Sequence, residues 1–165
     1  MTLPKAALLP AQTILVAKQM YTYHLYETDF YAWTQKQVSL LKVRQWDQLD
    51  THNLIEEIEA LGRKERQELR NRLGVLLGHL LKWQFQPEKR SNSWLGTIRE
   101  QRIQIKLLLG DSPSLKPYLD EFFLAAYELG LAVAIRETQL GEQIFPEICP
   151  YTPEQTMNPE FLPSN

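Results

Sequence analysis

The chain has 165 residues, with 18 Lys and Arg against 20 Asp and Glu, so its net charge is only −2 at pH 7. Hydrophobic residues make up 44% and charged residues 23%, which excludes a disordered chain and fits one globular domain. The single cysteine, Cys149, excludes an internal disulfide and a cysteine-only zinc site, and favours a reducing, cytoplasmic location.

The first 26 residues predict a flexible or loosely docked arm, followed by a single helical domain over residues 27–163. The arm holds no apolar run near the ~20 residues that a membrane span requires. It also lacks the long apolar region and the small-residue cleavage site of a secretory signal. We therefore expect no membrane association.

The first helix of the domain is expected to begin at Thr28. Thr28 can cap the helix, and the carboxylate of Asp29 suits its positive N-terminal end. Helical spacing then predicts one shared face, followed by a connection that contains Trp46. The residues of that face are Phe30, Trp33, Gln37, Leu40 and Leu41.

Two further helices are predicted from Asp50 or Thr51 onward. Gly62 marks a break or a bend between them, because glycine costs ~1 kcal/mol inside a helix. Gly74 and Gly78 either allow another backbone to approach closely or are tolerated on a polar face. The apolar stripe of the earlier helix contains Leu54, Ile58 and Leu61, with Ile55 beside it. The later helix, to Phe85, is central to the core through Leu69, Leu73, Leu76, Leu80 and Trp83.

The rest of the chain predicts two more helices and a proline-rich tail. Ser91 or Asn92 can cap the fourth helix, and Ser114 the fifth, which is expected to end near Gly141. Thr152 and the proline after it can start one short helical turn. The fifth helix is expected to face inward through Tyr118, Phe122, Ala125, Leu129 and Val133. The fold class is therefore all-α, a single-domain bundle of about five helices with a short proline-rich C-terminal tail.

Polar residues at apolar positions predict a cluster that is either functional or structural. His79 falls between apolar neighbours on the central helix, where it is a structural histidine or else a metal ligand or general base. Arg102 falls within the stripe of the fourth helix, and its burial is expected to require an acidic partner, such as Glu57. The full candidate cluster is Asp50, Asn53, Glu57, His79, Arg99 and Arg102.

Charge is uneven along the chain, with −4 over residues 27–62, +7 over 63–106 and −7 over 107–165. The segments either neutralise each other in the fold or leave a basic face that binds a polyanion. A nucleic-acid-binding protein or nuclease would use the segment 63–106, with basic residues on phosphates and Trp94 stacked on a base. The candidate surface contacts are Trp46, Lys89, Arg90 and Trp94.

Catalytic and metal-binding motifs are lacking. Di-metal helical bundles pair Glu and His at i, i+3, but the sequence has no Glu-x-x-His and no His-x-x-x-His, and we expect no metal and no cofactor. It also has no glycine-rich phosphate loop and no GxSxG elbow. A metal-dependent hydrolase around His79 and Glu57 is a second alternative, weaker than nucleic-acid binding.

Several segments of the sequence nevertheless resemble those of a known protein family. They are YETDFYAWTQKQ (26–37), LDTHNLIEEIEALGRKER (49–66), HLLKWQFQPEKRSNSW (79–94), TIREQR (97–102), DSPSLKPYL (111–119) and FPEICPY (145–151). In this order they resemble the bacterial, mainly cyanobacterial, domain of unknown function 29 family. The resemblance implies an all-helical cytoplasmic protein and assigns no activity or catalytic residue. We therefore expect a non-enzymatic module that binds a protein partner or itself.

Overall fold

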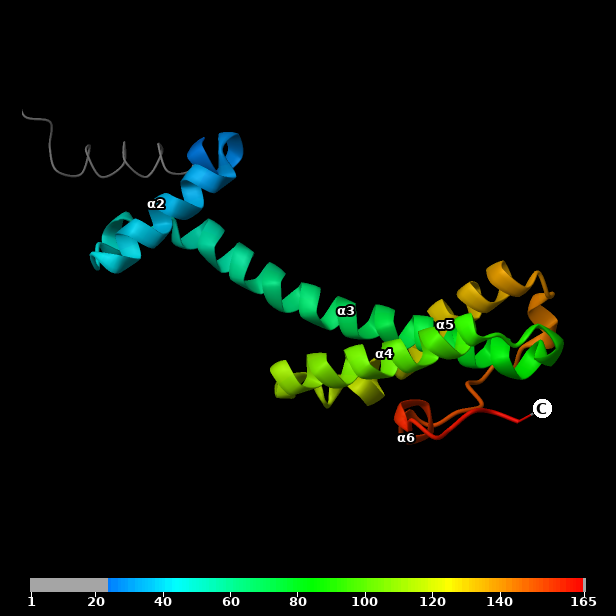
Figure 1. Ribbon diagram of the computed structural model, residues 1–165. Helices are drawn as coiled ribbons and strands as arrows, with labels where there is room; N and C mark the ends of the chain where they lie inside the picture. Colours follow the sequence, from blue (N-terminus) through cyan, green and yellow to red (C-terminus); the bar gives the residue numbers. More distant parts are fainter. Residues whose placement is uncertain (1–23, 165) are drawn as a thin grey trace, which may run out of the picture. The chain divides into compact units, whose positions relative to one another are not determined.

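The computed structural model describes residues 24–164, and within them every regular element is helical and none is a strand (Figure 1). The all-α prediction is confirmed. The predicted arm lies almost wholly outside the described residues. The α-helices are α2 (Phe30–Lys42), α3 (Thr51–Phe85), α4 (Asn92–Asp111), α5 (Tyr118–Thr138) and α6 (Pro153–Met157), preceded by a helical stretch at 24–28. The 3-10 turns are η1 (Trp46–Gln48), η2 (Pro87–Lys89), η3 (Pro113–Leu115) and η4 (Glu142–Ile144).

The chain divides into two compact units, and the boundary falls inside α3, between Leu61 and Gly62. We call them the N-terminal unit and the C-terminal unit and describe each by itself. The single domain predicted over residues 27–163 stays a prediction.

In the N-terminal unit, α2 begins one residue later than its Thr28 cap predicts. The Asp29 side chain accepts a hydrogen bond from the Ala32 amide, so Asp29 is the cap. The Thr28 hydroxyl instead donates to the carbonyl of His24, within the preceding helical stretch. The predicted face is buried at its centre, at Trp33, Gln37 and Leu40, and exposed at its edges, at Phe30 and Leu41.

The predicted interruption at Gly62 is wrong, because α3 runs unbroken for 35 residues. A Cβ at Gly62 would meet nothing within 4 Å, so no close neighbour requires a glycine at this position. Good helix formers on both sides offset its propensity cost of ~1 kcal/mol. The two helices predicted from the sequence are therefore one.

The core of the C-terminal unit lies along the second half of α3, as the leucine spacing predicts. Leu69, Leu73, Leu76 and Leu80 are all fully or almost fully buried, with Leu77 and Leu81 beside them. Helices α4 and α5 cover this arc from different sides, which explains why it is wider than a coiled-coil seam. Their buried residues are Ile98, Ile105 and Leu109 on α4 and Ala126, Tyr127 and Ala134 on α5.

Helices α3 and α5 cross at three glycines. A Cβ on Gly78 would lie 2.8 Å from the carbonyl oxygen of Gly130, and one on Gly130 would lie 2.8 Å from the amide nitrogen of Gly78. A Cβ on Gly74 would lie 3.3 Å from the carbonyl of Ala126. Of the two roles open for Gly74 and Gly78, close backbone approach is therefore the one observed.

This contact also corrects the predicted inner face of α5. That face is centred on Ala126, Gly130, Ala134 and Thr138, one position beyond the predicted stripe, and Leu129 is partly exposed. Small residues face α3 because only they allow the two backbones to approach. The larger residues Leu129 and Val133 flank the glycines of α3: the Cβ of Leu129 would lie 2.9 Å from a Cβ on Gly74, and that of Val133 2.9 Å from a Cβ on Gly78.

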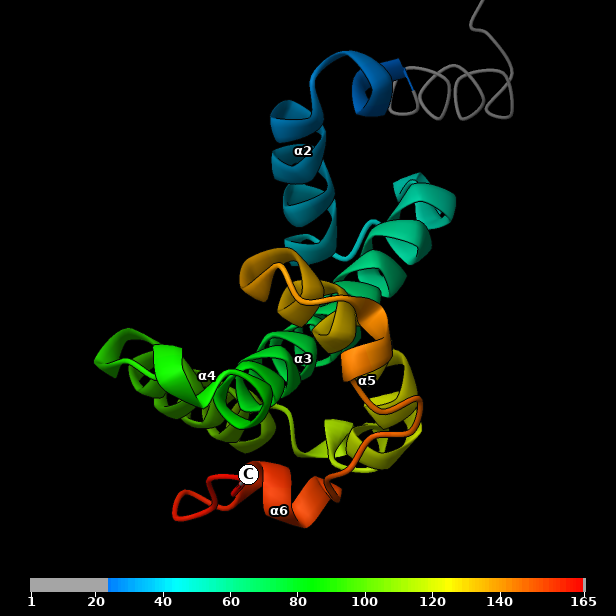
Figure 2. The same ribbon diagram turned by 90° about the vertical axis from the view of Figure 1, so that its right-hand side faces the viewer.

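The end of the chain folds back on the C-terminal unit. Helix α5 follows η3 and ends at Thr138, earlier than predicted, where Gln139 adopts a left-handed φ of 62°. The predicted short turn is confirmed as α6, with a capping box between Thr152 and Gln155. Helix α6 contacts α5 and lies below α4 in both views (Figures 1 and 2).

Candidate functional site

A buried lysine is the centre of the main polar site in the C-terminal unit. Lys82, on α3, is only 2% exposed, yet it carries an ammonium group. Its Nζ donates to Oε2 of Glu137 at 2.6 Å and lies 3.4 Å from Nε2 of His79. It also lies 4.4 Å from the centre of the Trp94 ring, a cation–π contact. We call these four residues the lysine cluster.

Three helices supply the lysine cluster. His79 and Lys82 are three residues apart on α3 and therefore share a face. The Ser91 side chain accepts from the Trp94 amide, which confirms Ser91 as the cap and fixes Trp94 in the first turn of α4. Glu137 lies in the last turn of α5, where the helix dipole disfavours an anion, so the ammonium of Lys82 compensates it.

His79 is neutral and acts as an acceptor. Burial lowers the pKa of His79, and the nearby Lys82 cation lowers it further, against the opposing effects of the Val75 carbonyl and Glu137. Nδ1 lies 3.0 Å from the Val75 carbonyl, so this nitrogen carries the proton and donates it. Nε2 is left to accept from Lys82. The predicted burial of His79 is confirmed.

Glu137 stays ionised in the cluster. Burial by itself would raise its pKa, but the hydrogen bond and charge of Lys82, with a bond from Arg136, lower it overall. Its side chain is 35% exposed, so solvent also reaches the carboxylate. Lys82 and Glu137 thus form an ion pair with one buried member and one partly solvated member.

A pH titration follows from the burial of His79. Because its pKa lies below 6.5 in the folded chain, the unfolded chain binds its proton more readily. We therefore expect the effect of His79 on the free energy of unfolding to be constant above pH 6.5. As the pH falls below 6.5, this effect should lower the free energy of unfolding by at most about 1.4 kcal/mol per pH unit. Urea unfolding at several pH values measures the slope. His79→Gln should reduce that slope; an equal slope in the variant and in the unaltered chain would contradict the assignment.

The ammonium of Lys82 is satisfied and enclosed within the lysine cluster. The ammonium of Lys82 has a carboxylate, an imidazole nitrogen and an indole face around it, and almost no surface through which a substrate could reach it. Such an arrangement fixes the register of three helices. The geometry favours the structural role for His79.

Arg102 is buried as predicted, but its partners are not acidic. Its Nε donates to the carbonyl of Thr156 at 2.8 Å, and its two Nη atoms donate to Pro159 at 3.3 Å and Phe161 at 2.8 Å. The expectation of a carboxylate partner is wrong for these three N–H groups, because the folded-back tail supplies carbonyls at the right spacing. Burial lowers the pKa of Arg102. Arg99 is exposed on the same helix.

The remaining candidates belong to the N-terminal unit. Asp50 accepts from the indole nitrogen of Trp33 at 3.1 Å and from the side-chain amide of Asn53 at 2.7 Å. Glu57 accepts from the Tyr26 hydroxyl at 2.7 Å, and this bond raises the pKa of Tyr26 to about 12. The first bond joins α2 to Asp50, just before α3, and the Tyr26 bond joins the helical stretch at 24–28 to α3. Their arrangement, like that of Arg102, is architectural.

The predicted surface contacts differ in exposure. Trp46 and Lys89 are exposed. Arg90 is exposed too, but it donates to the Trp83 carbonyl at 2.8 Å and its guanidinium lies over the Trp83 ring. Trp94 is half-buried against Lys82, so its ring is engaged by an ammonium instead of being open to stack on a base. This weakens the basis of the nucleic-acid alternative.

Lys82 and Glu137 are absent from the candidate residues that the sequence predicts. For Lys82 a signal exists, because it lies between Leu81 and Trp83 and one turn from His79, within the apolar arc of α3. For Glu137 no such signal exists, because it follows Arg136 at a helix end where charged residues are ordinary. Only the packing of α5 on α3 brings it to Lys82.

Within residues 24–164, no three His, Cys, Asp or Glu side chains come together in a group that could hold a metal ion. None of the described helices is both long enough and apolar enough to cross a bilayer.

Comparison with known proteins gives one match. The family model described as "Domain of unknown function DUF29" matches residues 25–162, which confirms the resemblance seen in the sequence. No curated protein and no solved structure matches the chain.

Proposed function

The chain belongs to the DUF29 family, and since that description assigns no function, we propose from the structure that it is a non-enzymatic module that binds a helical protein partner. The observation that carries the proposal is an exposed apolar strip on the first turns of α3. We call Ile55, Ile58 and Leu61 the interaction strip. Their exposed fractions are 58%, 65% and 61%.

The strip is continuous along the helix. Its residues are spaced by three, which places them within an arc of about 120° on one side of α3. Single exposed apolar residues are normal on a protein surface, but three adjacent ones mark an interaction site more often. Trp46, in η1 of the same unit, adds an exposed aromatic of the kind that anchors interfaces.

The chemistry of the partner follows from the charge around the strip. Residues 27–62 carry −4, and Glu59, which lies four residues after Ile55 and therefore next to the strip, is exposed. A partner that presents an apolar helix edge flanked by Lys and Arg would match both features. We therefore favour such a helix over a second copy of this chain.

A cytoplasmic location belongs to the same proposal. Cys149 is only half-buried, and burial raises the pKa of its thiol. A lone thiol of this kind is compatible with a reducing compartment.

Binding of an amphipathic Leu/Lys helical peptide tests the proposal, with a Leu/Glu peptide of the same pattern as the charge control. Labelled peptide is titrated with the full chain and followed by fluorescence anisotropy. We expect Ile58→Glu to weaken binding at least about tenfold, because it removes a contact worth roughly 1.5–3 kcal/mol when buried. The matched control is Leu124→Glu, on α5, where the leucine is 68% exposed.

Three results would overturn the proposal. The first is equal affinity of Ile58→Glu and the unaltered chain for the Leu/Lys peptide. The second is a loss of affinity in Leu124→Glu as large as that in Ile58→Glu. The third is a dimer in sedimentation velocity that Ile58→Glu dissociates, because the occupant of the strip would then be a second copy of the chain.

A further inference from the structure

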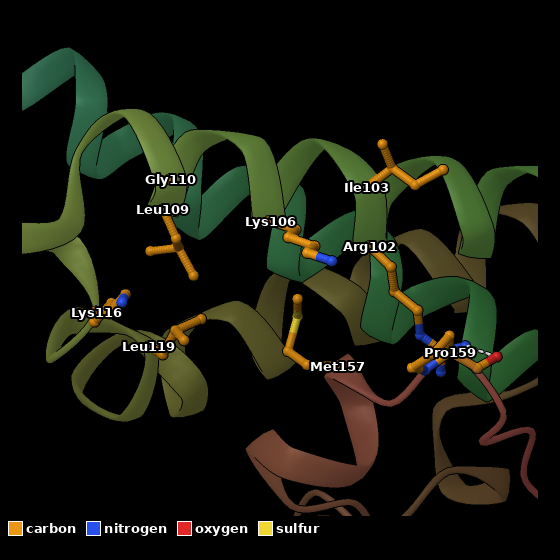
Figure 3. Close-up of a pocket in the computed structure, with 9 residues that line it drawn as sticks. All are labelled: Arg102, Ile103, Lys106, Leu109, Gly110, Lys116, Leu119, Met157 and Pro159. Carbon is orange, nitrogen blue, oxygen red and sulfur yellow. Dashed lines mark hydrogen bonds between the residues drawn. The ribbon is translucent and has the colours of Figure 1, made fainter.

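A pocket of about 700 Å³ opens beside α4 in the C-terminal unit (Figure 3). Helix α4 forms one wall, the segment from η3 into α5 forms the second, and α6 with the following tail forms the third. This volume lies within the range of small-molecule sites, roughly 300–1,000 Å³. The pocket is lined by Arg102, Ile103, Lys106, Leu109, Gly110, Lys116, Leu119, Met157 and Pro159.

The lining combines an apolar interior with basic groups. Figure 3 shows the side chains of Leu109 and Leu119 approaching each other from two walls, with Met157 extending from α6 toward α4. Lys106 and Lys116 are exposed, so their ammonium groups stay solvated at the opening. None of the nine lining residues is Asp or Glu.

The third wall is held in place by Arg102. Its three bonds to the carbonyls of Thr156, Pro159 and Phe161 fasten the tail on both sides of the lining residue Pro159. The pocket is thus preformed, which reduces the entropy that a ligand must overcome on binding. Met157 is the adaptable part of this wall, because its unbranched thioether adjusts to an apolar ligand.

We propose that this pocket binds an anionic amphiphile, an unbranched alkyl chain that ends in a carboxylate or a phosphate. The alkyl chain lies along Leu109, Leu119 and Met157, and the anionic head lies near Lys106 and Lys116. This site is independent of the interaction strip, which belongs to the other unit, so either proposal can fail without the other.

Methionine methyl resonances provide a direct test. The chain has three methionines, Met1, Met20 and Met157, and only Met157 lines the pocket. The full chain, labelled with ¹³C at the methionine methyls, is titrated with dodecanoate, with dodecyl phosphate and with dodecyltrimethylammonium, each below its micelle concentration. We expect the Met157 signal to shift in a saturable manner with one or both anions and to remain unshifted with the cation.

The three probes also separate the two kinds of head group. A saturable shift with dodecanoate alone identifies a carboxylate ligand, and one with dodecyl phosphate alone identifies a phosphate ligand. A saturable shift with both indicates that the site selects its ligand by negative charge. The proposal is overturned if neither anion shifts Met157, if the cation shifts it as strongly, or if Met1 and Met20 shift in parallel with it.

Charge reversal tests the role of the lysines. Lys106→Glu with Lys116→Glu should weaken binding of the anion about tenfold, and added salt should weaken binding to the unaltered chain. The matched control is Lys89→Glu, which is exposed in the same unit and does not line the pocket. Equal affinity of the double variant and the control for the anion would show that the two lysines do not bind the head group. The proposed selectivity for an anionic head group would then be wrong.

Discussion

Glu137→Gln is expected to destabilise the chain more than Lys82→Met, although the two changes break the same ion pair. In Glu137→Gln the ammonium of Lys82 remains 2% exposed and loses its carboxylate. An uncompensated buried charge costs about 3–5 kcal/mol, and the 35% exposure of Glu137 reduces this to about 2 kcal/mol here. In Lys82→Met the carboxylate that remains can turn to water, so we expect about 1 kcal/mol or less. Urea unfolding measures both.

The double variant Lys82→Met with Glu137→Gln makes the test sharper. In the double variant Lys82 is replaced as well, so no buried ammonium is left without a carboxylate partner. The double variant should therefore be more stable than Glu137→Gln by about 1 kcal/mol. Arg136→Gln is the control, because it breaks the exposed ion pair of the same carboxylate and should cost about 0.5 kcal/mol or less. Additive effects of the two single changes would show that Lys82 is not held by Glu137.

Gly130→Ala is expected to lower stability by about 2–3 kcal/mol, despite the better helix propensity of alanine. The new Cβ would lie 2.8 Å from the Gly78 amide nitrogen and 2.9 Å from the Gly74 carbonyl oxygen. Both are backbone atoms of α3, so neither can move without separating the helices. For a chain of this size the expected fall in melting temperature is about 5–10 °C, measurable by calorimetry or circular dichroism.

Gly96→Ala is the matched control for this prediction. Gly96 also lies inside a helix of the C-terminal unit, but a Cβ there would meet nothing within 4 Å. We expect a gain of about 0.5–1 kcal/mol from propensity alone. If Gly130→Ala behaved in the same way, the close crossing of α3 and α5 would be wrong.

Some features follow from local patterns in the sequence. Leucine spacing predicts the core face of α3, and the polar turn before α4 predicts its cap at Ser91. The Thr152 cap predicts α6, and apolar neighbours predict the burial of His79 and Arg102. These properties depend on residues within one or two turns of each other, so the sequence carries them directly.

Other features depend on which element packs on which. Periodicity places Arg102 inside but cannot identify its partners, because carbonyls have no signature in the side-chain sequence. Gly62 resembles a break, whereas good helix formers on both sides keep α3 continuous. The inner face of α5 is displaced by one residue, because three small residues permit a close crossing that spacing alone does not reveal.

The sequence by itself therefore determined the helical class, the core face of the second half of α3 and the burial of His79 and Arg102. The tertiary structure decided what satisfies them: Glu137 and Trp94 for Lys82, and the tail carbonyls for Arg102. The physical reason is that burial follows from the period of one helix, whereas the carboxylate that pairs with Lys82 and the carbonyls that accept from Arg102 lie 54–59 residues away in the sequence. Those groups reach it only after the helices have packed.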